Sequence, residues 1–427
     1  MANSFTKEEK VAFDDMLEGF NDELVMSALV NNYSLGDQEA ERGSDVIWRP
    51  VPYIAQSYTG LDQSANFGDS IQLSVPSQIG TVKSSNFTLN ATELRDATQA
   101  DRKTTAARQK LASDINVALM TTAANEGTVV IANAGAATGY DDVALADAAF
   151  NERGVQMSDR YMALSSRDYN GMAGNLAARS DMTGKPTRAY ENSYVGRVAG
   201  FETHKLDYAN RLTAAAGTTV TVNAAAAADR HYTPVSTTAS ANGFNRTNVD
   251  NRYMNLTIGV VGGTVKVGDA FTIAGVNSVH MITKEDTGQL QTFRIHEIVS
   301  GGGGAGVVKI SPAIVTNDVT TTAADEQYKN CSATPANGAA ITFLNIATAA
   351  VNPFWRKDAI ELLPSRLIMP ANSGMDTMSG TTDQGVSVLM TRQGAIGTLS
   401  VQYRIDVFFG TVMTDPSKAG IALFGQV

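Results

Sequence analysis

The chain has 427 residues, of which 43% are hydrophobic and 18% are charged, so it is too long for one compact core and too apolar for global disorder. Its formal net charge of −10, from 43 acidic and 33 basic side chains, argues against sequence-independent binding of nucleic acid, which needs a basic surface. The single cysteine, Cys331, excludes an intrachain disulfide, and no signal-peptide-like or membrane-spanning apolar run occurs, which predicts synthesis in a cytoplasm and no membrane contact.

Residues 6–34 have the pattern of an amphipathic helix. Thr6 and Glu9 form a capping box, and apolar residues recur at helical spacing from Phe13 to Ala28. The other side of this helix is mainly acidic. Two interpretations of that side remain open, a solvated face on a docked helix or an arm that meets a basic partner.

The next two segments are extended and then helical. Residues 49–82 contain Pro50, Pro52 and Pro76, which a helix interior does not tolerate, and they predict a long hairpin. Residues 91–126 carry the strongest helical pattern, with Gly127 where the helix should stop. A single helix of this length spans roughly 54 Å and suggests a strut. The alternative is two helices with a bend near Thr104.

The rest of the chain alternates between two kinds of sequence pattern. Residues 128–221 mix short strands and helices, and 171–200 read as an exposed loop or small hairpin. Residues 222–345 are rich in Thr, Val, Asn and Gly and predict an independent small β-barrel or sandwich. The mixed pattern then returns and ends in two strands. The expected strands cover 254–261, 270–275, 292–299, 306–310, 386–391 and 399–412.

No motif in the chain points to catalysis. The four histidines have no ligand spacing, which predicts no metal site, and a phosphate-binding loop is absent. The glycines of residues 301–306 formally match a dinucleotide fingerprint, but a strand follows them instead of a helix, so they read as a hairpin loop. Asp141 and Asp142 are typical of a helix start. We therefore expect no catalytic residue, no cofactor and no enzyme activity.

Two stretches, 196–202 and 352–360, look like the halves of one shell-forming domain that an inserted module separates. Further distinctive stretches are 46–51, 93–112, 248–253, 267–276 and 403–410. Together these stretches resemble the major coat proteins of short-tailed, double-stranded-DNA bacteriophages of the Lederbergvirus type, and the resemblance extends from end to end.

This resemblance implies an α+β, tailed-phage and herpesvirus-type capsid fold with an inserted antiparallel β-barrel. The parts would be an N-terminal arm, an extended loop, a peripheral domain with a long spine helix, and an axial domain whose residues 171–200 would be a second interlocking loop. Their expected bounds are arm 1–34, peripheral domain 35–49, 83–130 and 386–427 with spine helix 91–126, extended loop 50–82, axial domain 131–221 and 346–385, and barrel 222–345.

The resemblance also implies partners and contact residues. The chain would assemble with copies of itself into pentamers and hexamers, guided by a scaffolding protein, and join a portal protein in a procapsid that matures. That shell would enclose double-stranded DNA without sequence-specific binding, in a virion assembled in the bacterial cytoplasm. Scaffolding would contact Asp14, Asp15 and Glu18, and a loop at about 236–252 would reach a neighbouring capsomer through Arg246 and Asp250.

Three other functions are weighed against the capsid interpretation. A bacterial nanocompartment shell would share the fold, but the β-rich insertion and the arm argue against it. A carbohydrate-binding or capsid-decoration module would explain only the Thr-rich segment and neither the long helix nor residues 403–410. For an enzyme, the sequence offers no candidate catalytic residue. The leading prediction is a major capsid protein.

Overall fold

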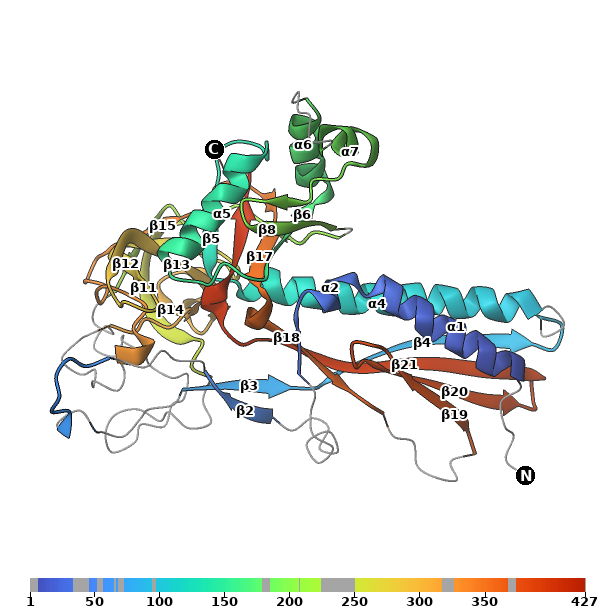
Figure 1. The fold of residues 1–427 in the computed structure, drawn as a ribbon. Coiled ribbons are helices and arrows are strands. Elements are labelled where there is room, and N and C mark those ends of the chain that lie inside the picture. The colour runs from blue at the N-terminus through green and yellow to red at the C-terminus, as the bar shows by residue number, and fades with distance from the viewer. Residues whose placement is uncertain are drawn as a thin grey trace. The chain divides into compact units, whose positions relative to one another are not determined.

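The computed structural model divides into two compact units, each built from three stretches of chain (Figure 1). The first unit consists of 1–47, 77–121 and 360–412, and the second of 48–76, 122–359 and 413–427. The residues that the structure describes are 7–33, 46–51, 57–64, 67, 73–93, 97–178, 185–206, 208–223, 250–316, 326–367 and 374–426.

The first unit is built on a six-stranded sheet. Its strand order is β1 (Asn31–Asn32), β18 (Ile360–Ser365), β21 (Ser400–Met413), β20 (Ser387–Ala395) and β19 (Asp376–Thr381). The sixth strand, β4 (Thr81–Asn90), pairs with β21 in an unbroken antiparallel ladder from Asn90 opposite Ser400 to Thr81 opposite Phe409. The strands expected at 386–391 and 399–412 are confirmed as β20 and β21.

β18 and β19 belong to this sheet, although residues 346–385 were expected to group with 131–221. The reason is hydrogen bonding: β19 forms a complete antiparallel ladder with β20, from Asp376 opposite Arg392 to Thr381 opposite Ser387. β18 pairs in parallel with β1. Strand partners of this kind are set by long-range pairing that the local pattern of residues 360–381 does not show.

The helix predicted over residues 6–34 is interrupted. α1 covers Lys7–Glu23, α2 covers Val25–Ala28, and the chain then enters β1. The side-chain amide of Asn116 donates to the Glu23 carbonyl at 2.9 Å, and its oxygen accepts from the Met26 amide at 3.3 Å. Asn116 therefore satisfies polar groups at the junction that a continuous helix would pair internally.

Replacing Asn116 with alanine should lower the free energy of unfolding by about 1–3 kcal/mol, because two half-buried backbone groups lose their partner. Urea unfolding of the unassembled chain measures this. Asn116→Asp is the matched control: it keeps the acceptor for Met26 but not the donor for Glu23, so its stability should lie between wild type and Asn116→Ala. An alanine variant as stable as wild type would show that the amide does not hold this junction.

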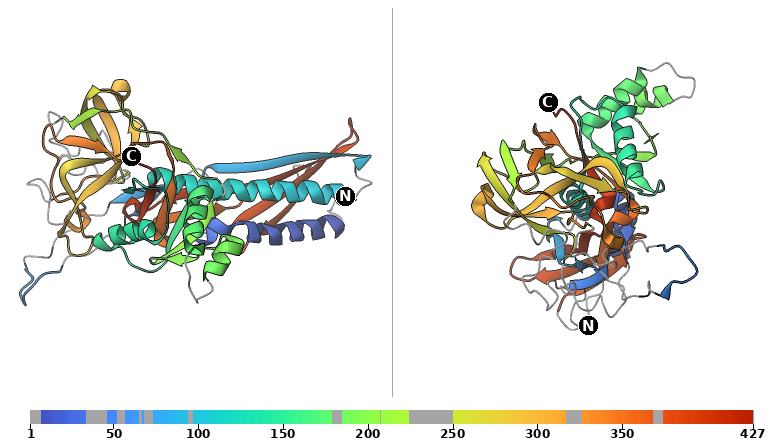
Figure 2. Two further views of the ribbon diagram at one scale, coloured as in Figure 1. Left: turned by 90° about the horizontal axis from the view of Figure 1, so that it is seen from above. Right: turned by 90° about the vertical axis from the view of Figure 1, so that its left-hand side faces the viewer.

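The long helix is one piece. α4 covers Ala97–Glu126, about 45 Å at the usual rise, and no bend divides it at Thr104, whose hydroxyl donates to the Ala100 carbonyl at 2.8 Å (Figures 1 and 2). It begins later than the predicted residue 91 because the chain stays extended through Asn90, and the Ala91 amide donates to the Leu399 carbonyl. An apolar stripe was predicted for this helix from the spacing of its residues, and all of its members except the half-buried Ala118 are buried. The stripe consists of Ala107, Leu111, Ile115, Ala118 and Leu119.

The second unit contains a six-stranded sheet and a closed barrel. The sheet order is β5 (Val129–Ala132), β22 (Ala419–Leu423), β17 (Asn352–Arg356), β6 (Arg160–Ser165), β8 (Phe201–Leu206) and β7 (Arg197–Val198). Phe201 of β8 and Phe354 of β17 both pack on Phe150 of α5 (Tyr140–Glu152), with ring centroids 5.7 and 5.0 Å from that of Phe150. Strands β7 and β8, from the stretch 196–202, and β17, from the stretch 352–360, thus lie in one sheet and contribute to one core, whereas Ile360 begins β18 of the first unit.

Two short helices replace the loop or hairpin expected at 171–200. α6 covers Ser166–Ala177 and α7 covers Lys185–Asn192. The Ser165 hydroxyl caps α6 by accepting from the Asp168 amide at 3.2 Å. A Cβ on Gly171 would lie 2.7 Å from the Ala137 carbonyl oxygen, so this glycine permits a close approach of backbone to helix rather than a turn.

The inserted barrel is confirmed and closes in the order β10–β11–β14–β13–β12–β15 (Figures 1 and 2). Alternating residues of these strands fill its interior, including Ile258, Phe271, Phe293 and Ile310. Gly301, Gly302 and Gly303 form a turn between β13 and β14 with φ of 84°, 61° and 91°, which explains the glycine run without any nucleotide. The strands are β10 (Thr219–Val222), β11 (Met254–Gly262), β12 (Ala270–Val279), β13 (Asp286–Ile298), β14 (Gly306–Ser311) and β15 (Ala340–Phe343).

The segment predicted as an extended loop is bounded by two paired strands, β2 (Val46–Pro50) and β3 (Ser74–Gln78). Much of the loop lies outside the described residues. Within its described part, Leu61 and Phe67 are large apolar side chains that are almost fully exposed. Large apolar groups exposed in this way are typical of surfaces that another chain covers.

Candidate assembly sites

The acidic side of α1 is exposed and its apolar side is buried. Phe13, Met16 and Phe20 are buried, whereas Asp14, Asp15 and Glu18 face solvent. Among the described residues, none of these three carboxylates has a hydrogen-bond or ion-pair partner. Because Glu18 lies three positions from Asp15 and four from Asp14, each of these two like-charge pairs is repulsive by a few tenths of a kcal/mol. The acidic face is thus free to accept a positive partner.

Polar contacts within the first unit anchor both ends of α1. Near its start, the Glu9 carboxylate accepts from Arg392 at 2.6 and 2.7 Å and from the Tyr403 hydroxyl at 2.8 Å. Burial, reinforced by this hydrogen bond to Glu9, raises the pKa of Tyr403 to about 12, so the hydroxyl remains a donor at neutral pH. At the other end, Glu23 pairs with Arg108 at 3.2 Å.

The middle of α1 rests on β19. A Cβ on Gly380 would lie 2.8 Å from Leu17 Cδ2 and 3.0 Å from Phe13 Cε1, so the absence of a side chain there lets the helix approach the strand. Because its ends and its buried side are held, α1 presents Asp14, Asp15 and Glu18 in a fixed arrangement. Binding a partner there requires no ordering of the helix.

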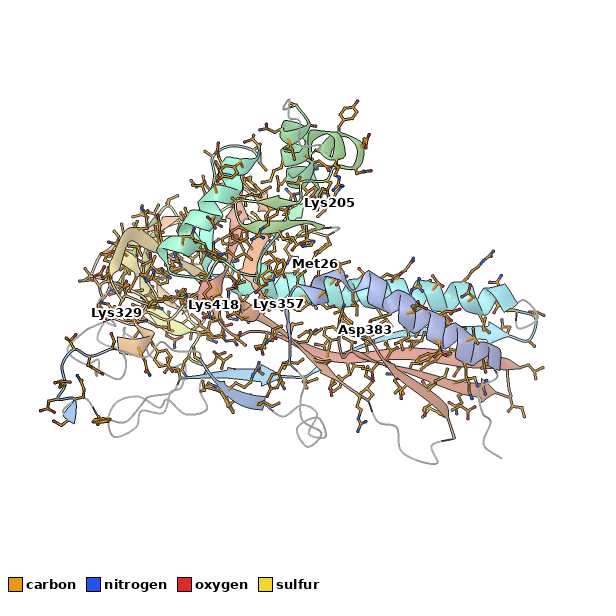
Figure 3. All side chains as sticks on the ribbon, in the orientation of Figure 1. Met26, Lys205, Lys329, Lys357, Asp383 and Lys418 are labelled. Atoms are coloured by element: carbon orange, nitrogen blue, oxygen red, sulfur yellow. The ribbon has the colours of Figure 1, made fainter. Side chains whose placement is uncertain are left out.

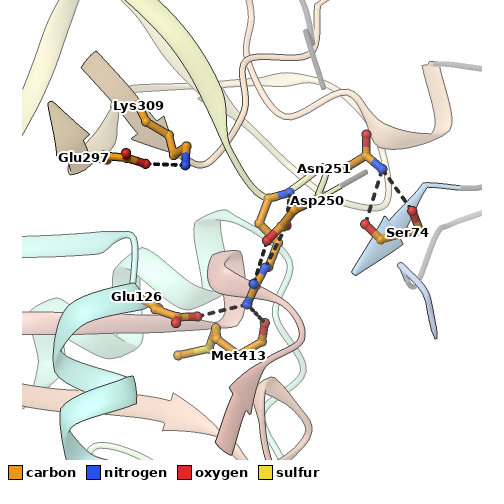
Figure 4. Close-up of polar contacts among 8 residues, drawn as sticks. Ser74, Glu126, Asp250, Asn251, Glu297, Lys309 and Met413 are labelled. Atoms are coloured by element: carbon orange, nitrogen blue, oxygen red, sulfur yellow. Dashed lines mark hydrogen bonds and ion pairs between the residues drawn. The ribbon is translucent and has the colours of Figure 1, made fainter. Parts of the chain in front are cut away.

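A second polar site lies at residues 250–252, just before the barrel strand β11 (Figure 4). Arg252 donates to both oxygens of Asp250, from Nε at 3.0 Å and from Nη2 at 2.7 Å. Its Nη1 donates to Glu126 Oε2 at 3.0 Å and to the Met413 carbonyl at 2.8 Å. The Arg252 cluster, made of Asp250, Arg252, Glu126 and the Met413 carbonyl, therefore joins the barrel chain to the end of α4 and the end of β21.

Burial dominates the electrostatics of the Arg252 cluster. It raises the pKa of Glu126, against the attraction of Arg252. It would lower the pKa of Arg252, but the hydrogen bond to Asp250 and the charge of Glu126 outweigh it and raise that pKa. The guanidinium also lies over the Tyr253 ring, 5.1 Å from its centroid. The site is a buried structural clamp in which the cation has two acidic partners.

The predicted contact residues differ in their surroundings. Asp14, Asp15 and Glu18 share one exposed face, while Asp250 is paired within its own chain and Arg246 lies outside the described residues. Sequence reasoning missed that Arg252 holds Asp250 and also pairs with Glu126. The spacing of Asp250 and Arg252 hints at a local pair, but nothing in the sequence connects either residue with Glu126, 126 positions from Arg252.

The described part of the chain contains no group of three His, Cys, Asp or Glu side chains arranged to hold a metal ion. None of its helices is both long and apolar enough to cross a membrane. Cys331 lies in the barrel core, where burial raises its thiol pKa to about 12. Asp142 begins α5 as expected, accepting from the Gly139 amide at 3.0 Å. These residues have structural explanations.

Comparison with known proteins finds a family whose model matches nearly the whole chain. Residues 1–425 match the family described as P22 coat protein, gene protein 5. The CUS-3 coat protein I-domain matches with 43% identity over 30% of this chain and 96% of that chain, with a TM-score of 0.21. A structure from Mycobacterium phage Che8 covers 93% of this chain and 90% of that chain at 10% identity, with a TM-score of 0.45.

A third structure, the asymmetric unit of the bacteriophage PhiM1 mature capsid, covers 100% of this chain and 89% of that chain at 9% identity, with a TM-score of 0.42. The predicted fold class, a mixed α+β capsid fold with an inserted barrel, is confirmed. The family match spans both units and the barrel, and so covers every part that the fold contains. The chain belongs to the P22 coat protein family and is a major capsid protein that forms an icosahedral shell in the virion.

Proposed function

We propose that this capsid protein assembles under the control of a scaffolding protein whose basic segment binds the acidic face of α1. The observation that carries the proposal is the fixed arrangement of Asp14, Asp15 and Glu18, which have no ion pair within the described part of the chain, on a helix anchored at both ends. Exposed ion pairs contribute at most about 1 kcal/mol each and are screened by salt. A contact built from them is reversible, which suits a partner that leaves when DNA enters.

The same proposal covers the wider assembly. Pentamers and hexamers of the chain form a procapsid that includes a portal protein, matures, and encloses double-stranded DNA without sequence-specific binding. Assembly takes place in the cytoplasm of the host bacterium, and the chain has no enzymatic role. The net charge of −10 supports a shell that contains the polyanion without gripping it.

Neutralising the acidic face in the variant D14N/D15N/E18Q should weaken scaffolding binding roughly tenfold, the effect of losing three exposed ion pairs of a few tenths of a kcal/mol each. The stability of the subunit should be unchanged or slightly higher, because like charges no longer repel. Affinity of purified subunits for the scaffolding protein, measured across a salt series, tests this. The wild-type salt dependence should be steeper than that of the variant.

The variant D101N/E191Q/E202Q serves as a control, because it removes the same charge from three other exposed carboxylates. It should bind scaffolding as wild type does. Equal weakening by both variants would indicate a general effect of net charge. Unchanged binding by D14N/D15N/E18Q would reject the acidic face as the contact.

We further propose that the loop at about 236–252 contacts a neighbouring capsomer, with Arg246 as the charge it presents. Asp250 would act at this contact by anchoring the end of the loop, because Arg252 engages both of its carboxylate oxygens. The support is the rigidity of the described end: the Asn251 amide also donates to the Ser74 carbonyl at 3.2 Å. Loss of particle yield in Arg246→Ala, with subunit stability unchanged, is the expected result.

A further inference from the structure

A cavity of about 160 Å³ in the second unit is lined by four cations, a notable concentration in an acidic protein. It lies between the turn that joins β12 to β13, the residues that follow 326–328, and the segment that precedes β22. Lys284, Lys329, Lys418 and Arg252 reach its wall, together with the polar side chains of Asn330 and Ser417 (Figure 3 labels Lys329 and Lys418).

Two of these cations are neutralised within the chain. Lys418 pairs with Asp415 at 3.1 Å and with Asp358 at 3.2 Å. Arg252 is held by the carboxylates of its own cluster. These two positive charges are therefore compensated before any ligand arrives.

The other two cations, Lys284 and Lys329, have no ion pair among the described residues. The Lys284 ammonium donates to the Lys329 carbonyl at 3.3 Å, which brings the two residues together despite their like charge. Burial and the charge of Lys329 lower the pKa of Lys284 to about 8. Hydrogen bonds from Asn277 and Gly288 lower the pKa of Asp286, and the charge of nearby Lys329 lowers it further. The Asp286 side chain is itself exposed. In the part of the chain that the structure describes, Lys284 and Lys329 are therefore left without an ion pair, although one carboxylate, Asp415, also lines the cavity.

The backbone around Lys284 is held in place. Lys284 has φ of 60°, a left-handed conformation that costs a lysine energy, and its amide donates to the His280 carbonyl at 2.9 Å. The His280 ring accepts from the amides of Ile282 at 3.3 Å and Thr283 at 3.2 Å. The strained turn is therefore maintained by specific hydrogen bonds.

Lys329 is fixed by its neighbour. Asn330 donates to the Ala313 carbonyl at 2.7 Å and accepts from the Val315 amide at 2.9 Å. The backbone of each lysine is thus held by a different element at one cavity. Two unpaired like charges close to each other repel, and an anion that pairs with both would remove that repulsion.

We propose that this cavity binds a carboxylate side chain of a second copy of this chain, with Lys284 and Lys329 as the cations that receive it. The occupant follows from the function: in a shell of identical subunits, the macromolecule adjacent to every subunit is another copy. Each copy carries 43 acidic against 33 basic side chains, so unpaired carboxylates are in excess. The inference rests on self-assembly and not on the scaffolding contact of α1.

Amine acylation followed by mass spectrometry tests the site in the wild-type protein. In free subunits Lys284 should react readily, because an amine of lowered pKa is largely available as the nucleophile near pH 8. In assembled shells acylation of Lys284 and Lys329 should fall about tenfold or more if a carboxylate holds both ammonium groups in place. Equal acylation in shells and free subunits would overturn the proposal while leaving the capsid function intact.

Adding inorganic phosphate to free subunits distinguishes a neighbour's carboxylate from free phosphate as the anion that binds the site. Phosphate at millimolar concentration should leave acylation of Lys284 and Lys329 nearly unchanged if the site is built for a neighbour's side chain. Protection by phosphate as strong as that in shells would assign the site to phosphate and overturn the proposal. Shells that contain and lack DNA should protect the two lysines equally.

The variant K284Q/K329Q should fold, since it removes a like-charge pair, and should raise the subunit concentration needed for assembly roughly tenfold. The effect should shrink at high salt, where the wild-type pair is screened. K110Q/K205Q is the matched control, because it removes the same charge from two exposed lysines. Assembly of K284Q/K329Q that equals the control at every salt concentration would contradict the site.

Discussion

Replacing Arg294 with methionine should lower the free energy of unfolding by about 3 kcal/mol, one of the two largest effects that we expect from a single substitution. Arg294 is a buried side chain of β13 whose guanidinium donates to the carbonyls of Ala124 at 2.6 Å, Gly127 at 3.4 Å and Gly268 at 3.2 Å. The first two belong to the end of α4, where helix carbonyls lack partners within the helix. Methionine would leave them buried and unpaired.

We expect this loss of stability to come from missing hydrogen bonds rather than from the burial of charge. A substitution at Arg153 distinguishes the two causes. Burial lowers the pKa of both Arg153 and Arg294 to about 10, so burying either cation has a similar cost. Among the residues that the structure describes, however, the Arg153 side chain makes only one hydrogen bond, a long one to the Thr292 hydroxyl at 3.4 Å. Arg153→Met should therefore be close to neutral.

Urea unfolding of unassembled subunits measures both substitutions, and amide hydrogen exchange over residues 120–130 reports on the helix end. Arg294→Met should destabilise the chain by about 2–4 kcal/mol more than Arg153→Met and speed exchange at the end of α4. Equal effects of the two variants would mean that burial of charge, and not capping of the helix, decides the outcome.

Local pattern predicted the elements whose own residues determine them. The stripe Ala107, Leu111, Ile115 and Leu119, without proline or glycine, predicted α4 as one helix, and its buried face is the predicted one. The strands of the barrel followed from runs of β-branched residues between glycine turns. In these segments, propensity, spacing and tertiary packing agree.

Prediction failed where a distant group decides the local structure. α1 ends at Glu23 because Asn116, 93 positions away, accepts and donates at the junction. Glycines at 171–200 suggested a loop, but Gly171 allows contact with Ala137 inside a helix. The capping of α4 by Arg294 and the pairing of Arg252 with Glu126 connect residues 126 or more positions apart. No periodicity within one segment reports such contacts.

The exposed carboxylates of α1 were predictable for a related reason. An amphipathic helix with one apolar side must expose the other, so Asp14, Asp15 and Glu18 could be placed on a surface from their spacing alone. Buried charges have no such rule, since each needs a partner from another part of the chain. That difference explains why the surface candidates were found and the Arg252 cluster was not.

Replacing Arg252 with methionine should destabilise the subunit by about 3 kcal/mol at neutral pH, because it leaves the half-buried carboxylate of Glu126 without its cation. Asp250 would lose both of its hydrogen bonds from the guanidinium, and the two carboxylates, 21% exposed at Glu126 and 20% at Asp250, keep some access to water. Urea unfolding at pH 7 measures the loss. Stability equal to wild type would show that the cluster is not a clamp.

The pH dependence of the same variant identifies Glu126 as the group responsible. Burial raises the pKa of Glu126 in the folded chain above its unfolded value, so the folded state binds more protons between the two values and stability falls as pH rises through that window. Without Arg252, which opposes this rise, the window should extend to higher pH. Arg252→Met should therefore regain part of its stability on acidification towards pH 5.

The double variant R252M/E126Q makes the argument decisive, because glutamine cannot ionise. It should be more stable than Arg252→Met at pH 7 and should lack the regained stability at low pH, since no carboxylate remains at position 126. If the double variant kept the pH dependence of Arg252→Met, another group would be titrating. A clamp of this kind joins residues 250–252, which lead into β11, to the end of α4, so its loss should reduce particle yield as well as subunit stability.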